Sequence, residues 1–217
     1  MSSNASWHKE KWTPLLNWDT PTGSLLRQAV KVLEDRLKPE AIQIIVFGSS
    51  PLQMGVSTAI TSGDLDIASD DDIQRLFTDA HLSKGQSSPY IEVCPTGTFR
   101  TALDWKSRCH IEKISWVEIL FPHPIDILVS KVRRGEEKDL EAFEEVIRKS
   151  GHPTELELKE SLMRAVHLYR PGYDEEVPGD PIYNTQILWQ RLFGRDIDVR
   201  KEIIVPGNSG TRPGEGV

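Results

Sequence analysis

The sequence predicts an α/β fold of the α+β kind, with a small mixed β-sheet of four or five strands, flanking helices and a helical C-terminal part. Two observations predict this class. Short apolar, β-branched segments, beginning with residues 42–47, alternate with segments whose apolar residues recur at helical spacing. After residue 154, only the helical spacing continues. Strands and helices that alternate in this way are typical of a sheet covered by helices.

Length and composition describe an ordinary globular chain. At about 150 residues per domain, 217 residues predict one domain with an appendage, or two small domains. Hydrophobic residues make up 38% and charged residues 27%, as in typical soluble proteins. The formal charge of −7 argues against a general nucleic-acid coat, whose affinity rests on phosphate neutralisation, but allows a local basic patch.

Targeting and redox features point to a reduced protein in the cytoplasm. No apolar run approaches the roughly 18 residues of a membrane span, and the N-terminus shows no apolar signal region. The two cysteines, Cys94 and Cys109, form no CxxC motif, and the six histidines are scattered without metal-binding spacing. We therefore expect a cytoplasmic protein with no membrane partner, and the oligomeric state stays open.

The first elements follow from hydrophobic periodicity. Residues 1–21 are rich in tryptophan without a clear period and predict an arm that packs on the body. Apolar residues at helical spacing from Leu25 to Leu37 predict an amphipathic helix with Ser24 as its N-cap. Residues 42–47 form a short β-branched run that stops at Gly48, which predicts a buried strand ending in a turn.

The middle of the chain predicts further strands around a polar loop. Residues 57–63 are small and polar, and residues 64–68 alternate between polar and apolar as a half-buried strand does. Ser69 is the expected cap of a helix that runs to about Ala80, with three aspartates in its first turn, namely Asp70, Asp71 and Asp72. Residues 90–93 and 115–121 are the remaining strand candidates.

The C-terminal half predicts helices. The expected ranges are 125–132 and 136–149, broken near Gly135, followed by 154–169 and 182–193, with a Pro/Gly/acid-rich link over 171–181. The last 12 residues, rich in Gly and Pro, predict a disordered tail. We therefore divide the chain into an arm (1–21), a main domain (22–150), a helical extension (151–205) and a tail (206–217).

Three acids stand out by their positions on predicted strands. Asp64 and Asp66 are two apart, so both side chains leave the same face of the sheet. Neighbouring carboxylates repel each other unless one is protonated or a cation lies between them. Mg²⁺ suits this arrangement because it prefers oxygen ligands. Glu92 lies within an apolar strand, and if that strand pairs with residues 64–68, the three carboxylates form one metal cradle.

The turn at Gly48 and Ser49 completes the candidate site. A glycine directly after a buried strand permits positive φ and close approach to a ligand. The Ser49 hydroxyl and the following amides, at a helix start, are suited to phosphate oxygens. Asp70, Asp71 and Asp72 have a simpler explanation, since acids in the first turn complement the helix dipole, and they are left out of the site.

These motifs resemble a known superfamily. The run IIVFGSS followed by SGDLDI is similar to the signature of polymerase-β-type nucleotidyltransferases, in which a strand, Gly-Ser, a spacer and Asp-x-Asp follow in order. The segments YIEV, DWKSR, PIDILVSK and KDLE resemble minimal nucleotidyltransferase-like proteins, relatives of the abortive-infection AbiEii toxins. The resemblance covers roughly residues 22–150 and implies a nucleotidyltransferase-like fold.

The resemblance also implies roles for individual residues. Gly48 and Ser49 would hold a nucleoside triphosphate such as ATP, and Asp64 and Asp66 would coordinate Mg²⁺. Glu92 would be the third carboxylate, which aids metal binding or deprotonates the acceptor hydroxyl. For the nucleotide, Lys131 matches a lysine that faces the phosphates, and Asp139 matches the acid that follows it.

Basic residues near Lys131 offer a positive face for a polyphosphate or an RNA end. Arg133, Arg134 and Lys138 either form this face or simply solvate a helix. Lys131 itself lies in an apolar stretch, and a buried lysine needs a partner, which an acidic or phosphate-binding site supplies. Arg100 and Arg108 are further candidates for the positive face. Packing is the simpler explanation of Trp105 and Trp116.

Two function hypotheses follow. The first is a Mg²⁺-dependent nucleotidyltransferase that moves a nucleoside monophosphate from an NTP to a hydroxyl on RNA, a protein or a small molecule. The second is a degenerate member that binds a nucleotide or a partner protein without turnover. It is motivated by a long spacer between Ser49 and Asp64 and by Glu92, where many superfamily members carry Asp. In a third reading, the acids merely cap strands.

Overall fold

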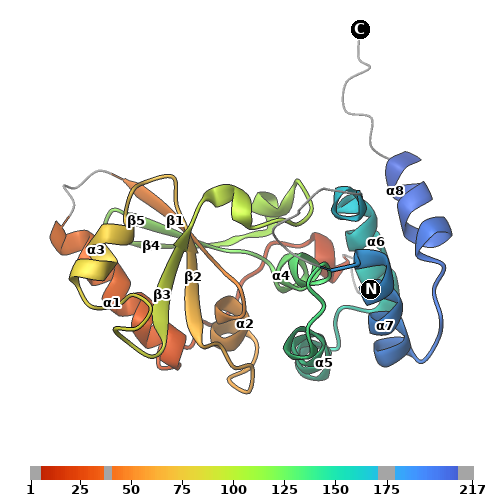
Figure 1. Ribbon diagram of the computed structural model, residues 1–217, viewed down its shortest axis with the longest axis horizontal. Helices are drawn as coiled ribbons and strands as arrows, with labels where there is room; N and C mark the ends of the chain where they lie inside the picture. Colours follow the sequence, from red (N-terminus) through yellow and green to blue (C-terminus); the bar gives the residue numbers. More distant parts are fainter. Residues whose placement is uncertain (1–5, 37–40, 171–178, 210–217) are drawn as a thin grey trace, which may run out of the picture.

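The computed structural model describes residues 6–36, 41–170 and 179–209 (Figure 1). The N-terminal elements are η1 (Trp7–Lys9), α1 (Pro21–Arg36), β1 (Ile42–Phe47), α2 (Ser50–Gly55), β2 (Asp64–Ala68), α3 (Gln74–Asp79) and β3 (Tyr90–Cys94). They are followed by η2 (Thr96–Thr98), η3 (Trp105–Arg108), β4 (His110–Ile114), β5 (Val117–Phe121), α4 (Pro124–Lys131) and α5 (Glu137–Ser150). The last are α6 (Glu155–Arg164), η4 (Val166–Tyr169), α7 (Pro181–Phe193), η5 (Arg200–Ile204) and α8 (Val205–Ser209).

The five strands form one mixed sheet in the order β3-β2-β1-β5-β4. The central strand β1 is antiparallel to β2 and parallel to β5, while β2 and β3 are parallel to each other. The edge strand β4 is antiparallel to β5. Because β2 runs opposite to β1, the end of β1 and its following turn lie beside the start of β2. The predicted fold class, a small mixed sheet with flanking helices and a helical C-terminal part, is confirmed.

Two apolar clusters, one on each face of the sheet, make the core. On one face α1 and α3 pack through Leu26, Leu33 and Phe77 (Figure 1). On the other face α4, α5 and α6 pack over residues such as Ile45 and Ala68. Successive strand residues point to opposite faces, so in β2 Leu65 and Ile67 join the first cluster and the two aspartates face the second.

The strands predicted around the candidate site are confirmed. β1 and β2 span the predicted ranges, and β3 extends the predicted 90–93 by one residue to Cys94. The strand predicted over 115–121 is confirmed as β5, which begins at Val117 after a hairpin turn at Ser115, where φ is +55°. The sequence pattern does not predict β4, the other strand of this hairpin. β4 carries charged residues on an edge with only one neighbour, so its apolar pattern is weak.

Several helix boundaries differ from the prediction. α1 begins at Pro21, and the Thr20 hydroxyl accepts a hydrogen bond from the Gly23 amide (3.0 Å), so the predicted cap at Ser24 is wrong. α3 begins only at Gln74, which leaves the three preceding aspartates outside it. Ser69 instead accepts a bond from the Asp71 amide in a local turn (3.1 Å).

The helical extension is confirmed from Glu155 onward, with a 3₁₀ segment, η4, at the end of the predicted 154–169 helix. α8 covers the first residues of the segment expected to be disordered, so that prediction is wrong for 206–209, while 210–217 lie outside the described residues. Most of the predicted link, 171–178, also lies outside them. Within the described part of the chain, none of the helices has the length and apolarity needed to span a membrane.

Candidate metal and nucleotide site

The three predicted carboxylates converge at one end of the sheet. Asp64 and Asp66 leave the same face of β2, and Glu92 lies opposite Asp66 in the parallel pair of β2 and β3. One oxygen from each of the three carboxylates lies within 4.8 Å of the others. Two oxygens bound to one cation at about 2.0–2.6 Å are separated by at most about 5 Å, so the donor set fits a single hard cation. The sheet register therefore builds the cradle that the sequence predicted.

The ionisation of Asp66 reflects this crowding. Burial of the side chain, then the charges of Asp64 and Glu92, raises the pKa of Asp66 to about 6. Lys131 and Arg134 oppose the shift without cancelling it. A cation bound between the three carboxylates offsets their mutual repulsion and favours the ionised form of Asp66. The electrostatics thus favour a bound divalent ion at this position.

Gly48 is required by the approach of the turn to Asp66. Its φ is +67°, in the left-handed region that favours glycine. A Cβ at this position would overlap the Oδ2 atom of Asp66. The glycine therefore lets the chain leave β1 directly beside the carboxylate cluster. Gly48 thus allows both the positive φ of the turn and the close approach to Asp66. Its role as a phosphate ligand stays a prediction.

Ser49 and Lys131 meet across the cavity. Ser49 precedes α2 without capping it, and its hydroxyl oxygen accepts a hydrogen bond from Lys131 Nζ (3.1 Å). Lys131 also lies 3.0 Å from Asp139 Oδ1, and its side chain is only 6% exposed. Burial lowers the pKa of Lys131, whereas the charge of Asp139 acts in the opposite direction. The predicted acidic partner of the buried lysine is therefore Asp139.

Asp139 lies behind the cavity wall. Its carboxylate receives Lys131 and two hydrogen bonds from Arg134, Nε to Oδ2 (2.8 Å) and Nη2 to Oδ1 (2.6 Å). Burial would raise the pKa of Asp139, but these cationic partners outweigh it and hold the pKa below its usual value. Asp139 also accepts a bond from the Glu136 amide at the start of α5 (3.3 Å). It thus reaches the cavity through the two basic side chains that it holds.

These groups line one cavity of about 510 Å³. Its size falls in the range of small-molecule sites, roughly 300–1,000 Å³. The corner between α4 and α5 contributes basic side chains to the same cavity, namely Lys131, Arg133, Arg134 and Lys138, which we call the basic wall. Arg100 joins the lining from the β3–β4 loop. All of them line the cavity, as the positive-face interpretation requires, and their binding of phosphates stays a prediction.

The sequence reasoning missed several uncharged lining residues, including Thr61, Ser62, Cys94, Thr98 and Ser130. Cys94 could have been found, because it lies two positions after Glu92 and so shares its face of β3. Burial, followed by the charges of the nearby acids, raises the pKa of the Cys94 thiol to about 11. The others lie on loops and a helix end, where no period marks them.

Other expectations are corrected. Arg108 does not line the cavity and is only 2% exposed, because it pairs with Asp126 (2.7 Å). Its expected contribution to the positive face is therefore wrong. Trp105 belongs to the core, and Trp116 packs against the opposite cluster, as the packing interpretation predicted. Asp70, Asp71 and Asp72 are exposed and lie outside the cavity lining.

The fold and the site together define a class. A mixed sheet that carries a glycine turn and strand-borne acids, with a basic wall in the same cavity, combines the donor types that metal ions and phosphates bind. The family model "Nucleotidyltransferase of unknown function (DUF6036)" matches residues 24–155. The chain therefore belongs to this nucleotidyltransferase family. No curated protein and no solved structure gives a significant match.

The matched region contains every residue of the predicted site, from Gly48 to Asp139. The coarser part of the resemblance, a nucleotidyltransferase-like protein, is thus confirmed. The finer resemblance to polymerase-β-type enzymes and AbiEii relatives stays a prediction. The whole arm (1–21) and the helical extension beyond residue 155 lie outside the matched region.

Proposed function

We propose that this protein transfers a nucleoside monophosphate from an NTP to a hydroxyl acceptor, with Mg²⁺ held by Asp64, Asp66 and Glu92, in the cytoplasm. The observation that carries the proposal is the convergence of the three carboxylates in one cavity that a basic wall also lines. An acidic cluster alone can bind many metal ions, and a basic wall alone can bind many anions. Their combination suits a metal-bound polyphosphate, which presents negative charge to both.

The reaction needs little covalent work from the protein. The acceptor oxygen attacks the α-phosphorus, the bond from the α-phosphorus to the oxygen bridging to the β-phosphorus breaks, and pyrophosphate leaves. When bound, Mg²⁺ supplies positive charge to the α-phosphate and the departing pyrophosphate. Asp139 accepts hydrogen bonds from Lys131 and Arg134 and so holds both side chains in place at the α4–α5 corner. These two basic side chains orient the phosphates. A Glu92 carboxylate oxygen accepts the proton of the attacking hydroxyl.

The acceptor fits at the mouth of the cavity. A cavity of about 510 Å³ holds a nucleotide but no large acceptor beside it. An RNA end, a protein side chain or a small molecule would each present its hydroxyl from outside. The incubation with labelled NTPs described below identifies the acceptor and the preferred base.

A second candidate is a nucleotide-binding module without turnover. The side chain of Glu92 is exposed, so packing does not fix the third carboxylate as it fixes Asp66. If the Glu92 carboxylate is held only loosely, metal binding is weakened, but a nucleotide can still bind to the basic wall. Thermal-shift titration separates the candidates, because stabilisation by NTP that is independent of Mg²⁺ favours the module.

The direct test incubates the protein with each labelled NTP, Mg²⁺ and candidate acceptors, including total RNA and the protein itself, and measures transferred label. The Asp64→Ala/Asp66→Ala double variant should abolish transfer. Asp72→Ala, an exposed acid outside the cavity, is the matched control and should leave transfer unchanged. Transfer that persists undiminished in the double variant would refute the assignment of these acids.

A further inference from the structure

One wall of the cavity is a loop that has little regular structure of its own. Between β3 and β4 the chain forms only the short turns η2 and η3, and it contributes Thr98, Phe99 and Arg100 to the lining. No ladder of strand hydrogen bonds fixes this segment. Its position relative to the acids and the basic wall must come from contacts with other elements.

The inner contacts come from α4. Asp126, in the first turn of this helix, accepts two hydrogen bonds from Arg108, from Nε (3.0 Å) and from Nη2 (2.7 Å). The Thr101 hydroxyl donates to the same carboxylate (3.3 Å). Both charged side chains are 2% exposed. Since Lys131 ends the same helix, α4 ties the loop and the basic wall into one frame.

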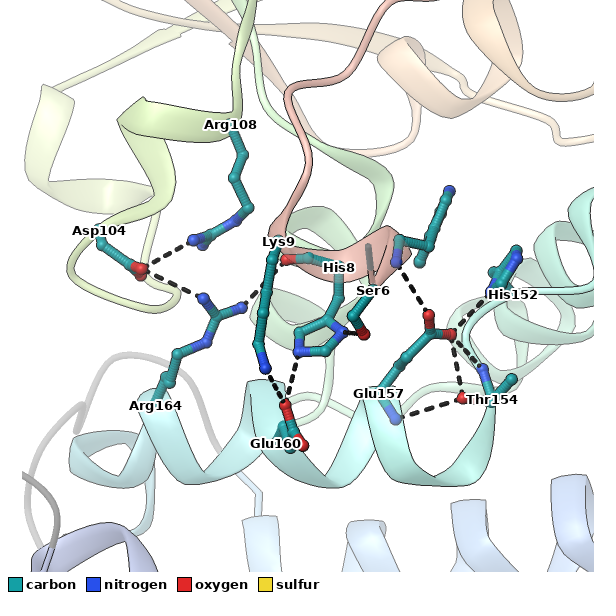
Figure 2. Close-up of polar contacts among 11 residues, drawn as sticks. Ser6, His8, Lys9, Asp104, Arg108, His152, Thr154, Glu157, Glu160 and Arg164 are labelled. Atoms are coloured by element: carbon teal, nitrogen blue, oxygen red, sulfur yellow. Dashed lines mark hydrogen bonds and ion pairs between the residues drawn. The ribbon is translucent and has the colours of Figure 1, made fainter. Parts of the chain in front are cut away.

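The outer contacts come from α6 and the N-terminal arm (Figure 2). A single oxygen of Asp104, Oδ2, lies 2.8 Å from Arg108 Nη1 and 3.1 Å from Arg164 Nη1. Arg164, at the end of α6, also donates from Nη2 to the His8 carbonyl (3.2 Å). The arm reaches the loop again where the Trp12 amide donates to the Arg108 carbonyl (2.9 Å).

The arm is itself fastened to α6. His8 Nε2 and Lys9 Nζ lie 2.9 and 2.7 Å from the same oxygen of Glu160 (Figure 2). The Trp7 amide donates to Glu157 one turn earlier in the helix (3.1 Å). Arm and helix are therefore joined to each other, and apart from Glu155, the first residue of α6, both lie outside the region that the family model matches.

We propose that the arm and α6 position the cavity wall for the nucleotide, with Asp104, Arg108 and Arg164 as positioning residues. The inference rests on the proposed function for the ligand but assigns a role to segments that the site itself does not include. Two guanidinium groups and two carboxylates make the cluster neutral. Removing Asp104 leaves two like charges close together and detaches the loop from α6.

Asp104→Ala is the cleanest perturbation. The Asp104 side chain is 52% exposed, and Arg108 keeps Asp126, so the variant should fold. The dissociation constant of a fluorescent ATP analogue with Mg²⁺ should rise at least about fivefold, because the wall is displaced from the bound nucleotide. Hydrogen exchange of the amides of residues 99–101 should accelerate by about tenfold as the loop opens locally.

Three further variants sharpen the test. Asp104→Glu keeps the charge and should restore most of the affinity. Arg195→Met removes an exposed ion pair with Glu155 of α6 and does not touch the loop. This control variant should change neither the nucleotide affinity nor the hydrogen exchange of residues 99–101. If Asp104→Ala failed to fold, Arg164→Met would break the same link from the other side, with the same two measurements.

Wild-type affinity together with wild-type exchange in Asp104→Ala would overturn the positioning role. Faster exchange with unchanged affinity would overturn it too, because the loop would then be loosened without consequence for the nucleotide. The proposed function fails separately, when the wild-type protein binds no NTP with Mg²⁺. In that case the exchange of residues 99–101 alone decides whether the arm and α6 hold the loop.

Discussion

Asp66→Asn keeps the shape of the side chain that lies against Gly48 and removes its negative charge. In the metal-free protein, burial and then the charges of Asp64 and Glu92 raise the pKa of Asp66 from 3.8 to about 6. A rise of this size corresponds to ~3 kcal/mol by which the ionised group destabilises the folded state. The substitution should therefore stabilise the protein while it removes a metal ligand.

The sign depends on pH. Because the pKa of Asp66 is higher in the folded than in the unfolded chain, the folded state binds the proton more readily between about pH 4 and 6. Protonation of Asp66 makes its full contribution to the free energy of unfolding below about pH 4, and this contribution is lost as the pH rises through 6. Asp66→Asn should match wild type near pH 4 and exceed it above pH 6. The gain is at most ~3 kcal/mol, or about 6–12 °C in Tm for a chain of this size.

The assay is thermal unfolding of both proteins from pH 4 to 8 in EDTA, repeated with Mg²⁺. Mg²⁺ should raise the Tm of wild type and leave that of the variant unchanged. Asp72→Asn, which alters an exposed acid near the same strand, should behave as wild type. Equal or lower stability of Asp66→Asn at pH 7.5 in EDTA would refute the electrostatic argument, as would equal stabilisation of both proteins by Mg²⁺.

Three more predictions concern the turn and the basic wall. Gly48→Ala combines the strain of positive φ, about 1–3 kcal/mol, with overlap at Asp66, so both Tm and the response to Mg²⁺ should fall in thermal melts. Lys131→Met removes a charge-assisted contact of about 1.5–3 kcal/mol and should weaken NTP binding by about 10–100-fold in calorimetry. Asp139→Asn leaves two basic groups without their charged partner and should lower the free energy of unfolding by about 3 kcal/mol in urea denaturation.

Controls and contrary outcomes are specific to each variant. Gly63→Ala, at a glycine with open space around it, should melt as wild type, and Gly48→Ala doing the same would contradict the close approach to Asp66. Unchanged NTP affinity in Lys131→Met would remove the lysine from the phosphate site. Glu141→Gln, an exposed acid on α5, is the control for Asp139→Asn, and equal stability of the two variants would contradict the buried network.

Much of the site could be predicted because its residues lie on regular elements. The apolar run before Gly48 marks β1, and the alternation in β2 places both aspartates on one face whatever the rest of the fold. The buried position of Lys131 in an apolar helix signals a need for a partner, which the structure supplies as Asp139. In each case a local pattern carries the information.

The rest depends on contacts that no local pattern encodes. Arg108 lies in an irregular loop, and its partner Asp126 is 18 residues away on α4, so its burial could not be read from spacing. β4 is an edge strand whose charged residues hide its period. The link from His8 through Arg164 to Asp104 joins three distant segments and exists only once α6 packs against the arm.

Above all, we propose that Asp64, Asp66 and Glu92 jointly hold a divalent cation beside an NTP. A crystal structure with Mn²⁺ and an NTP analogue that resists α,β-cleavage tests it most directly. We expect an anomalous peak at about 2.0–2.6 Å from carboxylate oxygens of Asp64, Asp66 and Glu92 and from a phosphate oxygen, with the phosphates facing Lys131. A nucleotide bound in the cavity with no anomalous peak at the three acids, or with the peak elsewhere, would contradict it.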